Sequence, residues 1–121
     1  MNRLHQSIFS SLDELSGADD KRIADGYATL VGRIEQAFHT EQEWMEKIDF
    51  PAMRLHQEEH ARVLAGLHHV HYSVLNGDVA IARRVVEELL PQWLAFHIAT
   101  MDTALAVAIE MSPLGSRQTV P

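Results

Sequence analysis

Apolar residues recur at helical spacing along nearly the whole chain, and this pattern constrains the fold more than any other feature. Four separate stripes follow the helical period, and no run of alternating polarity is long enough to indicate a strand. The stripes occupy residues 8–15, 23–38, 63–74 and 86–105. The sequence therefore predicts an all-α protein with four main helices.

Turn-forming residues separate the stripes. Ser16-Gly17 follows the first stripe, Asp49-Phe50-Pro51 the second and Asn76-Gly77-Asp78 the third. Helices joined by short connections pack as antiparallel neighbours, so we expect an antiparallel up-down-up-down four-helix bundle. We expect this bundle to occupy residues 1–112, followed by a C-terminal tail at residues 113–121.

Composition narrows the classes of function. The 121 residues suffice for one domain, and 17 acidic against 10 basic residues give a formal charge of −7. This charge disfavours nucleic acid and anionic membranes as partners. The absence of cysteine excludes disulfides and thiolate metal sites. Because no signal peptide or membrane span is evident, we expect a cytoplasmic protein, and the acidic surface favours a monomer.

Two pairs of metal-binding residue types have the spacing that places them on one helix face. They are His39-x-x-x-Glu43 and His56-x-x-x-His60, each with partners one helical turn apart. Imidazoles and carboxylates on facing helices build the buried di-metal sites of helix bundles. The two pairs are equidistant from the turn at residues 49–50, so they should lie level with each other.

A third pair, His97-x-x-x-x-Asp102, lies on the fourth predicted helix. His97 and Asp102 are level with His60 and His56 if the connection is centred near Asp78. On an ideal helix, residues five apart point about 140° away from each other. Local distortion or side-chain reach must therefore bring Asp102 inward.

His5, on the first predicted helix, is a further candidate ligand. It is level with His39 only if the whole stretch from Ser16 to Gly26 connects the first two helices. A tight turn at Ser16-Gly17 would leave His5 roughly 12 Å out of level, at about 1.5 Å per residue.

The remaining histidines and most acidic residues are interpreted as non-ligands. His68 and His69 point away from the candidate ligands, and His71 lies about 16 Å along the axis from His60. The second and third helices also carry acidic residues that we interpret as a solvated face. These are Glu35, Glu41, Glu46, Glu58 and Glu59.

Together, these blocks resemble the bacterial hemerythrins, oxygen-binding non-haem di-iron four-helix bundles. The resemblance runs from about His5 to Met111. Thr40 departs from it, since a phenylalanine commonly follows the second-helix histidine in that family. The matching blocks are His5-Gln6, His39-x-x-x-Glu43, Phe50-Pro51, His56-x-x-Glu59-His60 and Trp93-Leu94-x-x-His97-Ile98-x-x-x-Asp102.

The resemblance implies a cofactor of two non-haem irons. His56, His60 and His97 would bind one iron, while His5 and His39 would bind the other and leave an open position for dioxygen. Glu43 and Asp102 would bridge the irons together with an oxo or hydroxo group. Imidazole and carboxylate are suitable ligands for iron.

The function implied is reversible dioxygen binding for storage, delivery or sensing, without enzymatic turnover. One alternative is a di-iron enzyme on the same scaffold, acting on peroxide or nitric oxide. Another is a metal-poor or zinc-filled interaction bundle in which the histidines bind no iron. Metal analysis separates the last alternative from the other two.

Overall fold

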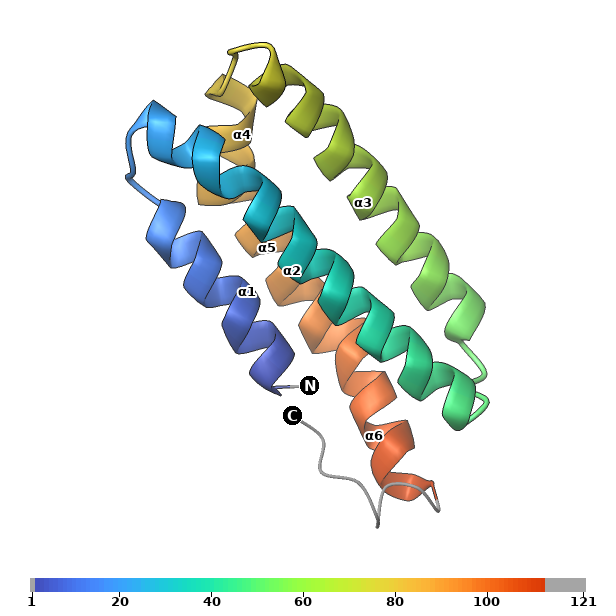
Figure 1. Ribbon diagram of the computed structural model, residues 1–121. Helices are drawn as coiled ribbons and strands as arrows, with labels where there is room; N and C mark the ends of the chain where they lie inside the picture. The colour runs from blue at the N-terminus through green and yellow to red at the C-terminus, as the bar shows by residue number, and fades with distance from the viewer. Residues whose placement is uncertain (1, 113–121) are drawn as a thin grey trace.

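The computed structural model describes residues 2–112, which are helical apart from short connections and include no strand. The helices form four segments, which lie side by side as a bundle (Figure 1). The all-helical prediction is confirmed, while the expected tail at 113–121 lies outside the described residues. The segments are α1 (Asn2–Leu15), α2 (Asp20–Lys47), α3 (Met53–Leu75) and a fourth that runs through α4 (Ala80–Arg84), α5 (Leu90–His97) and α6 (Thr103–Met111).

The connections contain residues that tolerate the left-handed backbone region. Gly17 has φ +75° and Gly77 has φ +89°, conformations that glycine adopts without steric cost. Asp49 has φ +51° in the α2–α3 connection, and aspartate is among the residues that visit this region. The three predicted turns therefore lie between helices, as the sequence indicates.

Gly26 lies inside α2 and is not part of a turn. A β-carbon at this position would lie 2.7 Å from Leu15 Cδ2, so glycine allows α1 and α2 to approach closely. The α1–α2 connection is therefore short, contrary to the long connection that the register of His5 with His39 required. Figure 1 shows that α2 begins further along the bundle than α1 ends, so the connection itself shifts α1 along the axis.

The fourth segment holds this connection in place. The backbone N–H of Gly17 donates to Glu87 at 2.8 Å, and Arg83 donates to the carbonyl oxygen of Ala18 at 2.7 Å. Arg83 also pairs with Asp20 at 3.0 Å. These contacts fix the upper end of α1, and with it the position of His5 near the other end.

The buried apolar residues form two clusters. The larger contains Ile8, Leu12, Tyr27, Leu30 and Leu94 among others, and includes residues of all four segments. The smaller one consists of Met45, Phe50, Leu105 and Ile109. On α2, α3 and the fourth segment, the buried polar residues described below lie in sequence between residues of the larger cluster and residues of the smaller one.

Two π-helical turns interrupt the fourth segment. The first, η1 (Val85–Leu89), lies directly before α5, whose first turn contains Pro91. The second, η2 (Ile98–Asp102), separates His97 from α6. A π turn holds one residue more than an α turn, and such turns occur frequently at functional sites.

Among the described residues, the fourth segment (Ala80–Met111) is long and apolar enough to cross a membrane by length and composition. The core helix of a water-soluble bundle passes the same test. This helix also carries the buried polar side chains His97 and Asp102.

Candidate metal centre

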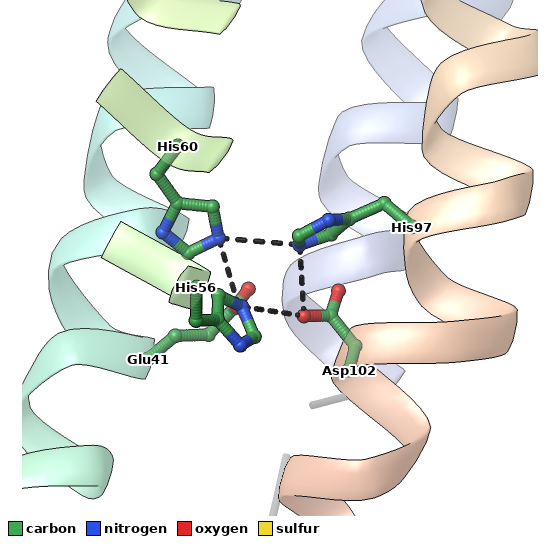
Figure 2. A group of neighbouring side chains, drawn as sticks. All are labelled: Glu41, His56, His60, His97 and Asp102. Atoms are coloured by element: carbon green, nitrogen blue, oxygen red, sulfur yellow. Dashed lines mark hydrogen bonds and ion pairs between the residues drawn. The ribbon is translucent and has the colours of Figure 1, made fainter. Parts of the chain in front are cut away.

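Five buried polar side chains from three segments meet in the interior of the bundle. Their donor atoms all lie within 4.8 Å of one another, and each side chain is almost fully inaccessible to solvent. Figure 2 shows the imidazoles and carboxylates pointing toward a common centre. The five residues are Glu41 on α2, His56 and His60 on α3, and His97 and Asp102 on the fourth segment.

The imidazoles converge through the same ring atom. His60 Nε2 lies 3.2 Å from His97 Nε2, and His56 Nε2 lies 2.9 Å from Glu41 Oε1. The same Glu41 oxygen is 3.3 Å from His60 Nε2. Because His56 and His60 are one turn apart on α3, both rings leave the helix on the face that meets α2 and the fourth segment.

Asp102 presents its two carboxylate oxygens to different neighbours. Oδ1 lies 3.0 Å from His56 Nε2 and 3.1 Å from His97 Nε2. Oδ2 lies 3.0 Å from His5 Nε2. His5 therefore reaches the edge of the group, and the aspartate stands between the three-imidazole side and the His5 side.

The turn η2 explains how Asp102 reaches the centre. On a regular helix, Asp102 would point about 140° away from His97. The π-helical backbone of Ile98–Asp102 contains the additional residue that brings the two side chains onto one face. The local distortion expected from the spacing is thus a π turn.

Aromatic rings hold two of the imidazoles. Phe38 stacks on His60 with ring centroids 3.7 Å apart and planes 2° from parallel. Trp93 stacks on His97 at 4.5 Å and 16°, and its indole N–H donates to Glu59 at 3.0 Å. These contacts limit rotation of the rings, so the direction of each Nε2 atom is set before any ligand binds.

Burial and close contacts between carboxylates and imidazoles shift the pKa values of three side chains in the group. Burial lowers the pKa of His56, but close contacts with the Asp102 and Glu41 carboxylates outweigh it and raise the pKa to about 9. Burial would raise the pKa of Asp102, but the hydrogen bond with His5 and the close contacts with His56 and His97 hold it well below its usual range. The pKa of His60 is lowered, chiefly by burial. The Asp102 carboxylate therefore keeps its negative charge in the interior, and a buried negative charge attracts a cation.

The predicted site residues on α2 do not join this group. The side chains of His39 and Glu43 are 69% and 53% exposed and lie 3.5 Å from each other. Glu41, which the sequence analysis assigned to the solvated face, is 1% exposed and lies within the group. The buried face of α2 contains Ile34, Phe38, Glu41 and Met45. The carboxylate that α2 directs into the group therefore lies two positions earlier in the sequence than expected.

The structure brings together His56, His60, His97 and Asp102 as expected, with His5 in contact through Asp102. The other histidines lie apart from the group. His68 is exposed and pairs with Glu35 at 3.6 Å, and the ring of His71 contacts Tyr27.

The donor atoms fit one metal ion on the three-imidazole side. Metal bonds to histidine nitrogen and carboxylate oxygen are about 2.0–2.2 Å long, so neighbouring ligand atoms are separated by roughly 3 Å. The distances of 2.9–3.3 Å between these atoms agree with that spacing. Asp102 Oδ1 is buried and makes no well-aligned hydrogen bond, as expected for an atom directed at an ion. The set of nitrogen and oxygen ligands, without sulfur, suits iron.

A groove of about 630 Å³ between α2 and α3 reaches the group from the surface. Its lining includes Phe38, His60 and Leu64, and the exposed His39 lies on its rim. The groove gives a small ligand an approach toward His60, which is 5% exposed.

Comparison with known proteins identifies a related chain. A curated protein from Ralstonia nicotianae (strain ATCC BAA-1114 / GMI1000), named Bacteriohemerythrin, is 34% identical over 98 residues. The aligned region covers 81% of this chain and 71% of that protein. No family model and no solved structure matches the chain.

Proposed function

Because the chain belongs to the bacterial hemerythrin family, we propose that it binds dioxygen reversibly at a non-haem iron centre. The observation that carries this proposal is the convergence of three imidazoles and two carboxylates in the interior of the bundle. The family points to oxygen binding rather than catalysis. Storage, delivery and sensing of dioxygen are the roles consistent with such a centre. We propose that the protein performs them as a monomer in the cytoplasm.

His56, His60 and His97 would hold one iron, together with Glu41 and Asp102. Glu41 takes the place first assigned to Glu43. On the other side of Asp102, Oδ2 and His5 face the position of a second iron. Ferrous iron in such a centre supplies the electrons with which dioxygen is bound.

The protein side chains serve to orient ligands and limit water. Phe38 and Trp93 fix the rings of His60 and His97 by stacking. Leu94 and Phe38 are buried beside the imidazoles and exclude solvent from that side. Limited water access favours reversible binding because it slows hydrolytic loss of the bound ligand.

The proposal is tested by loading the full chain with ferrous iron under anaerobic conditions and recording visible spectra. We expect an absorption band that appears in air and fades when oxygen is removed. His60→Ala should lose the band, while His39→Ala should keep it because His39 is exposed and outside the group. A chain that binds no iron would contradict the proposal.

The same experiment separates the alternative function. Iron that is oxidised once and cannot return to the oxygen-free spectrum would instead favour an enzyme acting on peroxide or nitric oxide. Turnover of either substrate by the wild type, and its loss in His60→Ala, would then be the decisive measurement.

A further inference from the structure

The second helix contributes a single donor to the centre. Glu41 is buried, and the residue one turn earlier on the same face is Ala37, which is 2% exposed. A methyl group cannot bind a metal. His39 cannot replace it, because a residue two positions from both Ala37 and Glu41 lies on the opposite side of the helix. Its side chain is 69% exposed, in agreement with that position.

The donor atoms are divided unequally by Asp102. On one side lie the Nε2 atoms of three histidines, with Glu41 Oε1 and Asp102 Oδ1 within 3.3 Å of at least one of them. On the other side, Asp102 Oδ2 faces the single imidazole of His5. His5 contributes no atom to the tightly spaced group of five.

We infer that the two metal positions of this chain differ strongly in affinity. The three-imidazole position holds one iron tightly, whereas the His5 position holds a second iron weakly because Ala37 leaves it one imidazole short. The inference rests on the proposed iron centre and specifies its stoichiometry. The second position offers only His5 and the carboxylate oxygens that the first position does not use.

The size of the difference follows from ligand chemistry. Changing a residue that merely supports a ligand costs about 10–100-fold in metal affinity. The absence of a ligand itself should cost at least the lower end of that range. We therefore expect the second iron to bind about ten-fold or more weaker than the first.

The test is an anaerobic titration of the full chain with ferrous iron, followed by desalting and measurement of bound iron. We expect two binding events in the wild type and one iron per chain retained after desalting. His5→Ala should abolish the weak event and leave the tight one. His97→Ala should abolish the tight event.

Ala37→His tests the inference in the opposite direction. It adds an imidazole one turn from Glu41, so the weak event should tighten about ten-fold or more and two irons should be retained. Ala37→Leu is the matched control, because it adds bulk without a donor atom and should retain one iron. His39→Ala should behave as the wild type.

Two irons of equal affinity in the wild type would overturn the inference and leave the proposed function intact. A folded Ala37→His variant that binds the second iron no more tightly than Ala37→Leu would also overturn it. If circular dichroism shows that Ala37→His is unfolded, the wild type and His5→Ala decide the question, since the inference fails when His5→Ala retains both events. A wild type that binds no iron would overturn the proposed function itself.

Discussion

Asp102 accepts a hydrogen bond from His5 across 97 residues of sequence, with 3.0 Å between Oδ2 and Nε2. This contact joins the first helix to the last at the buried polar group. Since the other oxygen of Asp102 faces His56 and His97, the aspartate contacts both sides of the centre. The geometry of the buried polar group therefore depends on the packing of α1 against the fourth segment.

Glu41 and Glu43 form a matched pair for testing the register of the second helix. Glu41→Gln should weaken binding of the first iron by about ten-fold or more, because it removes a buried negative charge beside His56 and His60. Glu43→Gln should leave the affinity unchanged, since Glu43 is half exposed and pairs with His39. Ferrous iron titrations of the two variants check this expectation, and equal losses in both would contradict the assignment.

Trp93 stacks on His97 and donates its indole N–H to Glu59, and we expect the stacking to contribute more to stability than the hydrogen bond. Trp93→Phe keeps a ring beside His97 but loses the bond to Glu59, so we expect a loss of about 1 kcal/mol in unfolding free energy. Trp93→Ala removes both contacts and should cost about 3 kcal/mol. Urea denaturation of the metal-free proteins measures these values. Glu59→Ala is the control that removes the acceptor of this hydrogen bond while keeping the stacked ring.

Tyr27 should make the fold sensitive to alkaline pH. Burial raises the pKa of Tyr27 to about 12, from about 10 in the unfolded chain. The neutral phenol is favoured in the folded state, so its contribution is fully present below pH 10 and is lost as pH rises to 12. At about 1.4 kcal/mol per unit, the loss is roughly 3 kcal/mol.

Tyr27→Phe provides the comparison for this pH effect. It removes the ionisable hydroxyl, together with the 2.9 Å hydrogen bond to the carbonyl oxygen of Leu67. The variant should be about 1 kcal/mol less stable at pH 8, yet lose less stability than the wild type between pH 10 and 12. Denaturation at several pH values measures both, and parallel pH profiles would contradict the prediction.

Iron should stabilise the folded chain by mass action. When the free iron concentration is one hundred times the dissociation constant, the free energy of unfolding rises by about 2.7 kcal/mol. For a domain of this size, that corresponds to a rise of roughly 10 °C in Tm. Adding a chelator to the loaded protein should reverse the shift, and His60→Ala should show none. A Tm that does not respond to iron would indicate that the buried group binds no metal.

Much of this architecture follows from local sequence rules. The apolar stripes predict the four helical segments, and Gly17, Pro51 and Gly77 mark the ends of three of them. The shared face of His56 and His60 also follows from spacing, since the two residues are one turn apart, whereas Asp102 reaches the face of His97 only through the π turn η2. The helical prediction succeeds because helix periodicity and turn chemistry are properties of short stretches of chain.

The residue that the second helix contributes to the buried group could not be predicted from the spacing of its histidine and glutamate alone. His39 and Glu43 have the spacing of a ligand pair and nearly the expected distance from the turn, so the sequence favours them over Glu41, which the structure places in the buried group. The helix surface decides between them, because Glu41 continues the apolar line of Phe38 and Met45 while Glu43 does not. If the register moves by two residues, Ala37 stands at the position of the second-helix histidine. Phe38 is then the phenylalanine that follows this position, so Thr40 no longer departs from the family pattern.

The placement of His5 could not be obtained from counting residues. The count assumes that a connection adds no displacement along the bundle axis. Here the contacts of Arg83 and Glu87 hold the α1–α2 connection in an arrangement that shifts α1 relative to α2. Long-range contacts of this kind are invisible to the spacing within either helix.

The π turn between His97 and Asp102 also governs the residues that follow it. One extra residue rotates the rest of a helix by about 100°, so η2 sets the face on which α6 presents Leu105 and Ile109 to Met45 and Phe50. Deleting a residue from η2 would therefore rotate Leu105 and Ile109 away from the smaller apolar cluster and would also misplace the Asp102 carboxylate. Packing at that end of the molecule and the position of the Asp102 carboxylate therefore depend on the same turn.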